Sequence, residues 1–205
     1  SATDTYNTAV GYGAGQSVTT GTINTIIGGL AGDALTTGNS NVALGYGSLS
    51  SDTTGDRSTA LGFQALAVQN FTSNTDTYNT AVGYNAGVAV TTGVQNTLIG
   101  GLAGDAVTSG SYNVATGYGA LTAATTAVQN AAFGRLALED NTTGSNNTAI
   151  GNHSLGNNTT AANNTAVGYF ALGANTTGTF NVAVGTSAGI AVTTGQFNTF
   201  TGGQA

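Results

Sequence analysis

Small and apolar residues recur along this chain at a fixed interval of 17 residues. Each unit opens on Asn-Thr-Ala-Val-Gly or a close variant, with an apolar residue at position 3 and Gly at position 5 in every copy. Position 1 is Asn in all copies but one, where Ser58 takes its place, and four additional residues within 70–78 lengthen that same unit. Because a repeat of this kind dictates the fold, we interpret residues 1–205 as a single repeat array. Its units begin at residues 7, 24, 41, 58, 79, 96, 113, 130, 147, 164, 181 and 198.

The unit predicts strands rather than helices. A helical hairpin repeat needs about 33 residues or more, and the Gly, Asn and Thr that dominate this unit are weak helix formers. The opening residues of each unit instead have the character of a short strand. If the units stack, each strand pairs with its copy in the next coil, roughly 4.8 Å away. We therefore expect an all-β fold, a parallel β-solenoid of about twelve 17-residue coils.

Two columns of identical residues follow from such stacking. Gly at position 5 is expected to supply a bend with positive φ that a Cβ would oppose. Asn at position 1 is expected to form a side-chain amide ladder, as stacked Asn does in cross-β assemblies. The residues of this ladder are Asn7, Asn24, Asn41, Asn79, Asn96, Asn113, Asn130, Asn147, Asn164, Asn181 and Asn198.

Positions 9 and 12 exchange volume from unit to unit. Where position 9 is Gly, position 12 is Val or Leu, as in Gly15 with Val18; where position 9 is Leu, position 12 is small or polar, as in Leu121 with Ala124. No unit breaks this rule. Because protein cores are packed to near-crystalline density, two positions that trade volume in this way are expected to fill one cavity.

Positions 3 and 4 are both apolar in most units, although neighbouring strand residues point to opposite faces. One of the two can fill the inside of the coil, and the other lies on a surface that needs a cover. We expect the chain to cover it by self-association as a parallel homotrimer.

Charge and motifs argue against catalysis and nucleic-acid binding. Only 5% of the residues are charged, and the net charge of −6 comes from eight acidic residues against Arg57 and Arg135, so the basic patch of a nucleic-acid-binding protein is missing. The only histidine, His153, has no partner that would make it a general base. The acids are dispersed and mark no pair across a cleft. We expect no enzyme, and we assign no catalytic, cofactor-binding or metal-ligating residue and no cofactor.

Position 6 carries an aromatic residue in half of the units. Such a row could stack on sugars, because an aromatic ring offers an apolar face beside a polar hydroxyl. It could equally pack between coils or between subunits, which is the interpretation that we favour. The row consists of Tyr12, Tyr46, Phe63, Tyr84, Tyr118 and Tyr169.

The Asn-Thr-Ala-Val-Gly opening, as in residues 7–11, 79–83 and 164–168, resembles the repeats in the heads of trimeric autotransporter adhesins. With the Thr-Thr-Gly that follows it, the unit also resembles repeats of bacteriophage tail fibres. The resemblance covers essentially the whole chain. It implies a trimeric, left-handed parallel β-roll that forms the shaft or head of an attachment fibre, of which this chain is one segment.

The resemblance predicts a non-enzymatic structural and attachment fibre, located outside the cell on a virion tail or a bacterial surface. Its expected partners are further copies of itself and a cell-surface glycan or host receptor, with no nucleic acid and no membrane insertion. The alternative is an ice-binding β-solenoid, suggested by the recurring Thr-Thr-Gly, as at Thr19–Gly21. Adjacent threonines point to opposite sides of a strand, which weakens that alternative.

Overall fold

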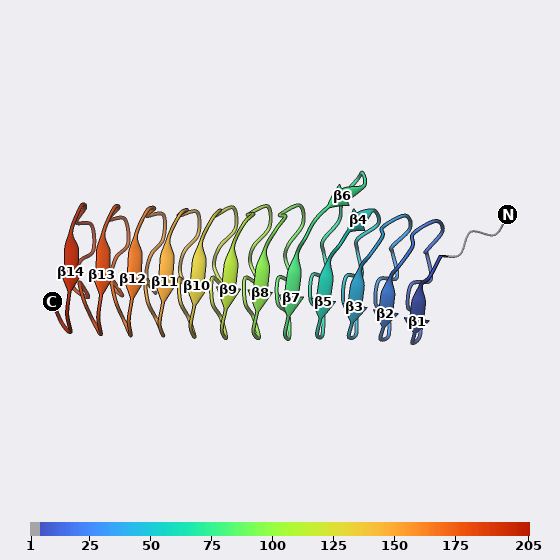
Figure 1. Ribbon diagram of the computed structural model, residues 1–205, viewed down its shortest axis with the longest axis horizontal. Coiled ribbons are helices and arrows are strands. Elements are labelled where there is room, and N and C mark those ends of the chain that lie inside the picture. The colour runs from blue at the N-terminus through green and yellow to red at the C-terminus, as the bar shows by residue number, and fades with distance from the viewer. Residues whose placement is uncertain (1–4) are drawn as a thin grey trace.

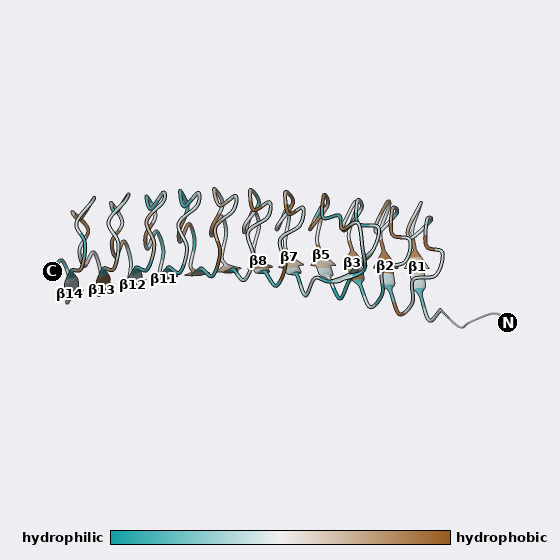
Figure 2. Cartoon of the chain, turned by 90° about the horizontal axis from the view of Figure 1, so that it is seen from above, coloured by the Kyte–Doolittle hydropathy of each residue, from teal (hydrophilic) through white to brown (hydrophobic). Residues whose placement is uncertain are grey.

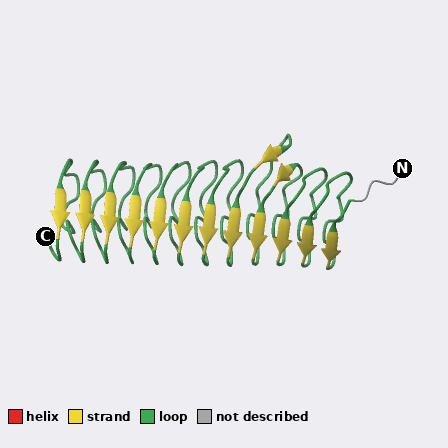
Figure 3. Ribbon diagram, viewed as in Figure 1, coloured by secondary structure: helices red, strands yellow, loops and turns green. Residues whose placement is uncertain are grey.

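Short strands stacked in one direction make up the regular structure of this protein. The computed structural model describes residues 5–205, and that part of the chain contains strands and turns but no helix. Figures 1 and 3 show the strands side by side along a rod, with β1 at one end and β14 at the other. The prediction of an all-β parallel β-solenoid is confirmed, and twelve strands delimit eleven turns of the described coil. Residues 1–4 of the predicted array lie outside the described residues.

One parallel sheet runs the length of the rod. Its strands are β1 (Thr8–Val10), β2 (Thr25–Ile27), β3 (Val42–Leu44), β5 (Thr59–Leu61), β7 (Thr80–Val82), β8 (Thr97–Ile99), β9 (Val114–Thr116), β10 (Ala131–Phe133), β11 (Thr148–Ile150), β12 (Thr165–Val167), β13 (Val182–Val184) and β14 (Thr199–Thr201). Seen from above, the strands lie along one side of the rod and the turns extend on the other (Figure 2).

The register follows the repeat, including across the long unit. Thr8 pairs with Thr25 one unit later, and Thr59 pairs with Thr80 across the insertion. The extra residues leave the rod as a lateral projection (Figure 1), where β4 (Gly55–Asp56) and β6 (Thr75–Asp76) form a separate two-stranded sheet. An ion pair between Arg57 and Asp76 joins the two strands of that projection. The insertion is therefore accommodated without a shift in the main sheet.

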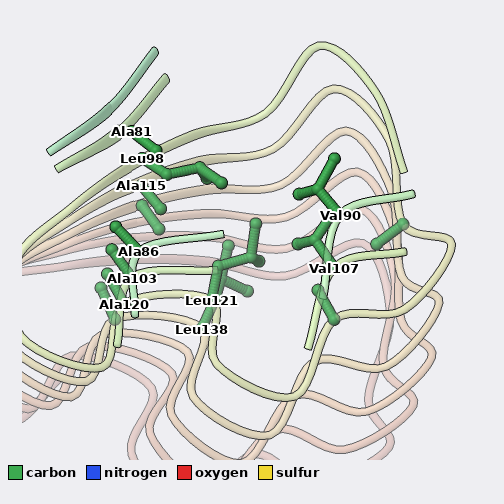
Figure 4. Packing of buried hydrophobic residues seen from close by; sticks show 14 of the residues in the cluster. Ala81, Ala86, Val90, Leu98, Ala103, Val107, Ala115, Ala120, Leu121 and Leu138 are labelled. Atoms are coloured by element: carbon green, nitrogen blue, oxygen red, sulfur yellow. The ribbon is translucent and has the colours of Figure 1, made fainter. Parts of the chain in front are cut away.

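The exchange of volume between positions 9 and 12 predicts that these two positions fill one cavity. In the structure, position 3 fills the same cavity as well. A Cβ on Gly87 would lie 3.3 Å from Val90 Cγ2 at position 12, but only 2.7 Å from Leu98 Cδ1 at position 3 of the next coil. A Cβ on Gly104 would also lie 2.7 Å from Leu98, at its Cδ2 atom. Figure 4 shows Leu98 projecting into the interior, with Val90 and Val107 on the far side. A bulky residue at position 3 thus requires glycine at position 9 in its own coil and in the coil before it.

The glycines at position 5 have a positive φ, between +117° and +141°, as expected. Close approach between coils is a second reason for glycine here. A Cβ on Gly134 would lie 2.5 Å from the carbonyl oxygen of Gly151 in the next coil. Among the position-5 glycines, only Gly202, in the last coil, has no neighbouring atom within 4 Å of the place where a Cβ would lie.

Left-handed backbone also occurs in columns of residues that are not glycine. The residue before each position-1 Asn has a positive φ throughout, from Tyr6 at 51° to Phe197 at 58°, and the column includes the β-branched Ile23 at 60°. This conformation costs roughly 1–2 kcal/mol per residue. In most coils it places the backbone N–H of this residue on a carbonyl of the preceding coil, as Ser40 donates to Thr22 at 2.9 Å. The stacking of coils therefore stabilises a conformation that a single coil would avoid.

Substitution within the position-5 column tests the close approach of coils. Gly134→Ala and Gly202→Ala introduce the same backbone strain, but only the former pushes a methyl group against the next coil. We expect Gly134→Ala to lower the free energy of unfolding by about 1–3 kcal/mol more than Gly202→Ala, the usual cost of overpacking. Urea denaturation of both variants at one protein concentration measures the difference, and equal costs would show that the coils do not stack as described.

Candidate functional site

The position-1 asparagines lie in one column inside the rod, and each except Asn198, in the last coil, bonds in two directions. Asn147 Nδ2 donates to the Ala161 carbonyl at 2.8 Å, which closes its own coil, and Asn147 Oδ1 accepts the Asn164 N–H at 3.0 Å, which joins the next coil. The same pair of bonds recurs along the column, with Asn7 and Asn41 as further examples. Direct amide–amide bonds, the basis of the expected ladder, occur at only some steps, such as Asn113 to Asn96 at 3.1 Å. The constant partners of these side chains are backbone groups.

The column is interrupted at Ser58, where a buried polar network replaces it. Gln69 Nε2 donates to Ser58 Oγ at 2.7 Å and to Asp52 Oδ2 at 2.6 Å, while Gln69 Oε1 accepts from Asn79 Nδ2 at 2.8 Å. The Gly55 N–H donates to Asp52 Oδ1 at 3.0 Å. Burial raises the pKa of the Asp52 carboxyl, and the bonds from Gln69 and Gly55 oppose that rise only in part. The coil that lacks the asparagine is thus held by a chain of side-chain bonds around a buried carboxyl group.

A second buried amide ladder lies at position 12, where the sequence suggested only small or polar side chains. Asn158 Nδ2 donates to Asn141 Oδ1 at 2.8 Å, and Asn175 Nδ2 donates to Asn158 Oδ1 at 3.0 Å. The ladder ends because the next coil has Val192 at this position, which leaves the buried Asn175 Oδ1 without a hydrogen-bond donor. The sequence signal for this ladder was asparagine at position 12 of three successive units.

The first threonine of the Thr-Thr-Gly turn uses its hydroxyl within the rod. Thr36 Oγ1 donates to the Thr53 carbonyl at 2.9 Å, and Thr142 Oγ1 donates to the Thr159 carbonyl at 3.0 Å. The same bond recurs in most coils between residues 19 and 193. The second threonine is exposed in several coils, as at Thr126 and Thr143. Only one of the two hydroxyl columns therefore remains free to face solvent or a ligand.

The remaining titratable side chains form no site with the features of a catalytic or metal centre. His153 lies 3.4 Å from Glu139 Oε2, 3.5 Å from an Arg135 nitrogen and 4.9 Å, ring centroid to ring centroid, from Phe170 on which it stacks. Across residues 5–205, no three His, Cys, Asp or Glu side chains gather closely enough for a metal ion, and no pocket opens on the surface. The same residues include no helix long and apolar enough to cross a membrane.

The aromatic row at position 6 lies at one margin of the main sheet. Its residues are substantially exposed, from 41% for Phe63 to 87% for Tyr12. The three that occupy consecutive coils stack on one another: the ring centroids are 5.7 Å apart for Tyr46 and Phe63 and 5.4 Å apart for Phe63 and Tyr84, with nearly parallel rings. Tyr169 instead contacts Phe170 edge-on. The row is thus a stack in its middle and a set of separate rings elsewhere.

Large apolar side chains are concentrated on what we call the sheet face. We define it as the outward side chains of the main sheet, at positions 2 and 4, with its two margins, at position 17 and at position 6. All of the exposed large hydrophobic side chains in the described chain belong to it except Val68 and Ile190. None of the described carboxylates belongs to it; these are Asp33, Asp52, Asp56, Asp76, Asp105, Glu139 and Asp140. The sheet face therefore carries most of the exposed large apolar side chains and none of the described carboxylates of an acidic protein.

Comparison of the chain with protein-family models, with curated proteins and with solved structures finds no match.

Removal of one position-1 side chain tests the asparagine column. Asn147→Ala leaves the buried Asn164 N–H without a partner, at about 1–3 kcal/mol, whereas the Ala161 carbonyl keeps a donor in Asn158 Nδ2. We expect the free energy of unfolding to fall by about 1–3 kcal/mol in urea denaturation. Asn157→Ala, at an exposed position of the same unit, is the matched control and should change little. Equal effects of the two substitutions would contradict the structural role of the column.

The buried carboxyl group predicts a pH dependence of stability. Because the pKa of Asp52 is higher in the folded than in the unfolded protein, its contribution favours folding below the unfolded pKa, of about 4, and is lost as the pH rises through the folded pKa. Asp52→Ala recreates the Leu–Ala pairing of Leu121 with Ala124 and removes this titration. Urea denaturation across the pH range should show the wild type losing stability relative to the variant as the pH rises; a constant difference would refute the assignment.

Proposed function

We propose that this chain is a segment of a non-enzymatic structural and attachment fibre, of bacteriophage tail-fibre or bacterial surface-adhesin type, acting on a virion or bacterial surface outside the cell. The observation that carries the proposal is the concentration of exposed apolar side chains on the sheet face. Monomeric soluble proteins rarely expose a continuous apolar patch larger than a few hundred Å². Exposed large apolar side chains recur on the sheet face from Val10 to Val184, as expected of a subunit that associates laterally.

The assembly we propose is a parallel homotrimer with left-handed coils, as in the fibres that the repeat resembles. Three sheet faces meet around a common axis, so that the apolar side chains of position 4 cover one another. Charge supports this choice of surface: each copy has a net charge of −6, and the sheet face contributes none of the described carboxylates. Like-charged copies therefore approach through the surface where their repulsion is weakest.

The ice-binding alternative has one observation in its favour, the exposed column formed by the second threonine of the turn. The first threonine adds no second rank of free hydroxyls, because it donates to the next coil. Thermal hysteresis of the purified protein would favour this alternative over the fibre.

The association state tests the proposal. Sedimentation or mass photometry should find particles of three times the mass of one chain. Phe133→Asp with Ile150→Asp places two carboxylates at position 4 of neighbouring coils, where both side chains are 42% exposed, and should yield folded monomers.

Val68→Asp with Ile190→Asp is the matched control, because these side chains are equally exposed, at 42% and 40%, but lie off the sheet face. This variant should remain trimeric. A monomeric wild type, or dissociation of both variants alike, would overturn the proposed assembly.

A further inference from the structure

The sheet face repeats with the coils, so it does not by itself fix how far one copy is displaced along another. Position 2 is Thr, Val or Ala, and position 4 is apolar in all coils but two. A displacement by one coil, roughly 4.8 Å, therefore brings like residues together again. A face with so little variation along its length specifies register weakly. A parallel assembly of such rods needs a feature that differs from coil to coil.

The lateral projection formed by β4, β6 and residues 70–78 is such a feature, because the unit that contains it is the only one to depart from the 17-residue period. It extends beyond the ends at which the main-sheet strands begin (Figures 1 and 3), next to the position-17 margin. Thr54 Oγ1 donates to the carbonyl of the buried Phe71 at 2.7 Å, and the Thr77 N–H donates to the Asp56 carbonyl at 3.0 Å. The projection is therefore held on the rod by hydrogen bonds and a buried ring.

The foot of the projection presents a cation and an aromatic ring. Arg57 and Tyr78 are the position-17 residues on either side of it, and each is about half exposed. The Arg57 guanidinium pairs with Asp76 and lies 5.8 Å from the centre of the Tyr78 ring. Arg57 is the only charged residue at position 17 of any unit. A guanidinium and a ring are both groups that pack well on aromatic faces.

The three-ring stack lies in the same coils, on the opposite margin of the sheet face. Strand β5 separates Arg57 from Phe63, and strand β7 separates Tyr78 from Tyr84. No other three consecutive units carry aromatic residues at position 6. Because the width of the sheet lies between the two margins, these two sets of side chains do not meet within one chain.

We infer that the foot of the projection on one copy docks on the three-ring stack of the next copy and so fixes the axial register of the parallel trimer, an inference that rests on the assembly proposed above. A closed ring of identical parallel subunits brings one margin of each subunit against the opposite margin of the next, at the same height along the axis. At the height of the projection, this symmetry brings Arg57 and Tyr78 of one copy to Phe63 and Tyr84 of its neighbour.

The two margins also match in residue type elsewhere on the rod. Position 17 is tyrosine in three units, and in each case position 6 of the unit that follows is tyrosine as well. Since the two tyrosines lie at opposite ends of a strand, no contact within one chain accounts for the match, whereas stacking of rings between two copies in register does. The three pairs are Tyr6 with Tyr12, Tyr78 with Tyr84 and Tyr112 with Tyr118.

A double-mutant cycle on assembly tests this contact. Tyr78→Ser and Tyr84→Thr each remove one ring, and Ser40 and Thr186 show that the two positions accept these residues. Fluorescence-detected sedimentation of the labelled full chain over a dilution series gives the concentration at which half of the chains are assembled. We expect each single variant to raise that concentration about tenfold, because ring contacts between copies are lost, and the double variant to raise it little further.

Tyr78→Ser combined with Tyr46→Thr is the matched control. Tyr46 ends the same stack two coils from Tyr84, and its exposure is similar, at 52% against 58%. Because Tyr46 lies at a different height along the axis, the effects of Tyr78→Ser and Tyr46→Thr should multiply. Coupling of Tyr78 to Tyr46 in place of Tyr84, or coupling to neither, would overturn the inference.

The wild type in the same dilution series separates this inference from the proposed function. A wild type that stays monomeric at every concentration overturns the proposed assembly and the docking together. A trimeric wild type in which the effects of Tyr78→Ser and Tyr84→Thr multiply overturns the docking alone. The circular dichroism of all variants should match that of the wild type, because the three substituted side chains are more than half exposed.

Discussion

The asparagine that opens each coil makes the connection on which the rest of the structure depends. Its amide group closes the coil 14 residues later, and its oxygen accepts the N–H of the corresponding asparagine one coil on, as at Asn147. Both bonds are buried, where an unsatisfied polar group is costly, so a slip of one residue would leave two backbone groups without partners. The register of the whole sheet, from β1 to β14, follows from this requirement. Where the asparagine is absent, at Ser58, the side chain of Gln69 joins Ser58 to the amide of Asn79 instead.

The interior of the coil that this connection encloses is narrow, and it therefore has room for few large apolar side chains. Most core positions hold alanine, and a single bulky residue such as Leu98 already requires glycine at two neighbouring positions. The remaining large apolar side chains therefore lie outside, and nearly all of them gather on the sheet face. We propose self-association through that face because this coil cannot bury its own apolar residues.

The sequence was sufficient for those features that depend on one residue type in one column. The period of 17 predicted the parallel strands, and the unvarying glycine at position 5 predicted the positive φ found at Gly134. The left-handed column before each asparagine could not be predicted, because the residues there, such as Ile23 and Arg57, do not favour that conformation. The third member of the core was missed because position 3 is bulky in few coils. The aromatic row could be located from the sequence, but the stacking of Phe63 on Tyr46 and Tyr84 depends on ring orientations that the sequence does not give, and the role of the row in packing or sugar binding stays a prediction.

Amide hydrogen exchange along the asparagine column tests the central claim most directly, because it reports each inter-coil bond separately. The account predicts that the N–H groups of Asn113, Asn130 and Asn164, each bonded to the asparagine oxygen of the preceding coil, exchange only when the protein unfolds globally. The N–H of Asn79, whose acceptor is the Thr77 hydroxyl at 3.4 Å, should exchange faster through local opening. Rapid exchange at all four amides would contradict the account, since it would mean that the asparagines do not hold one coil on the next.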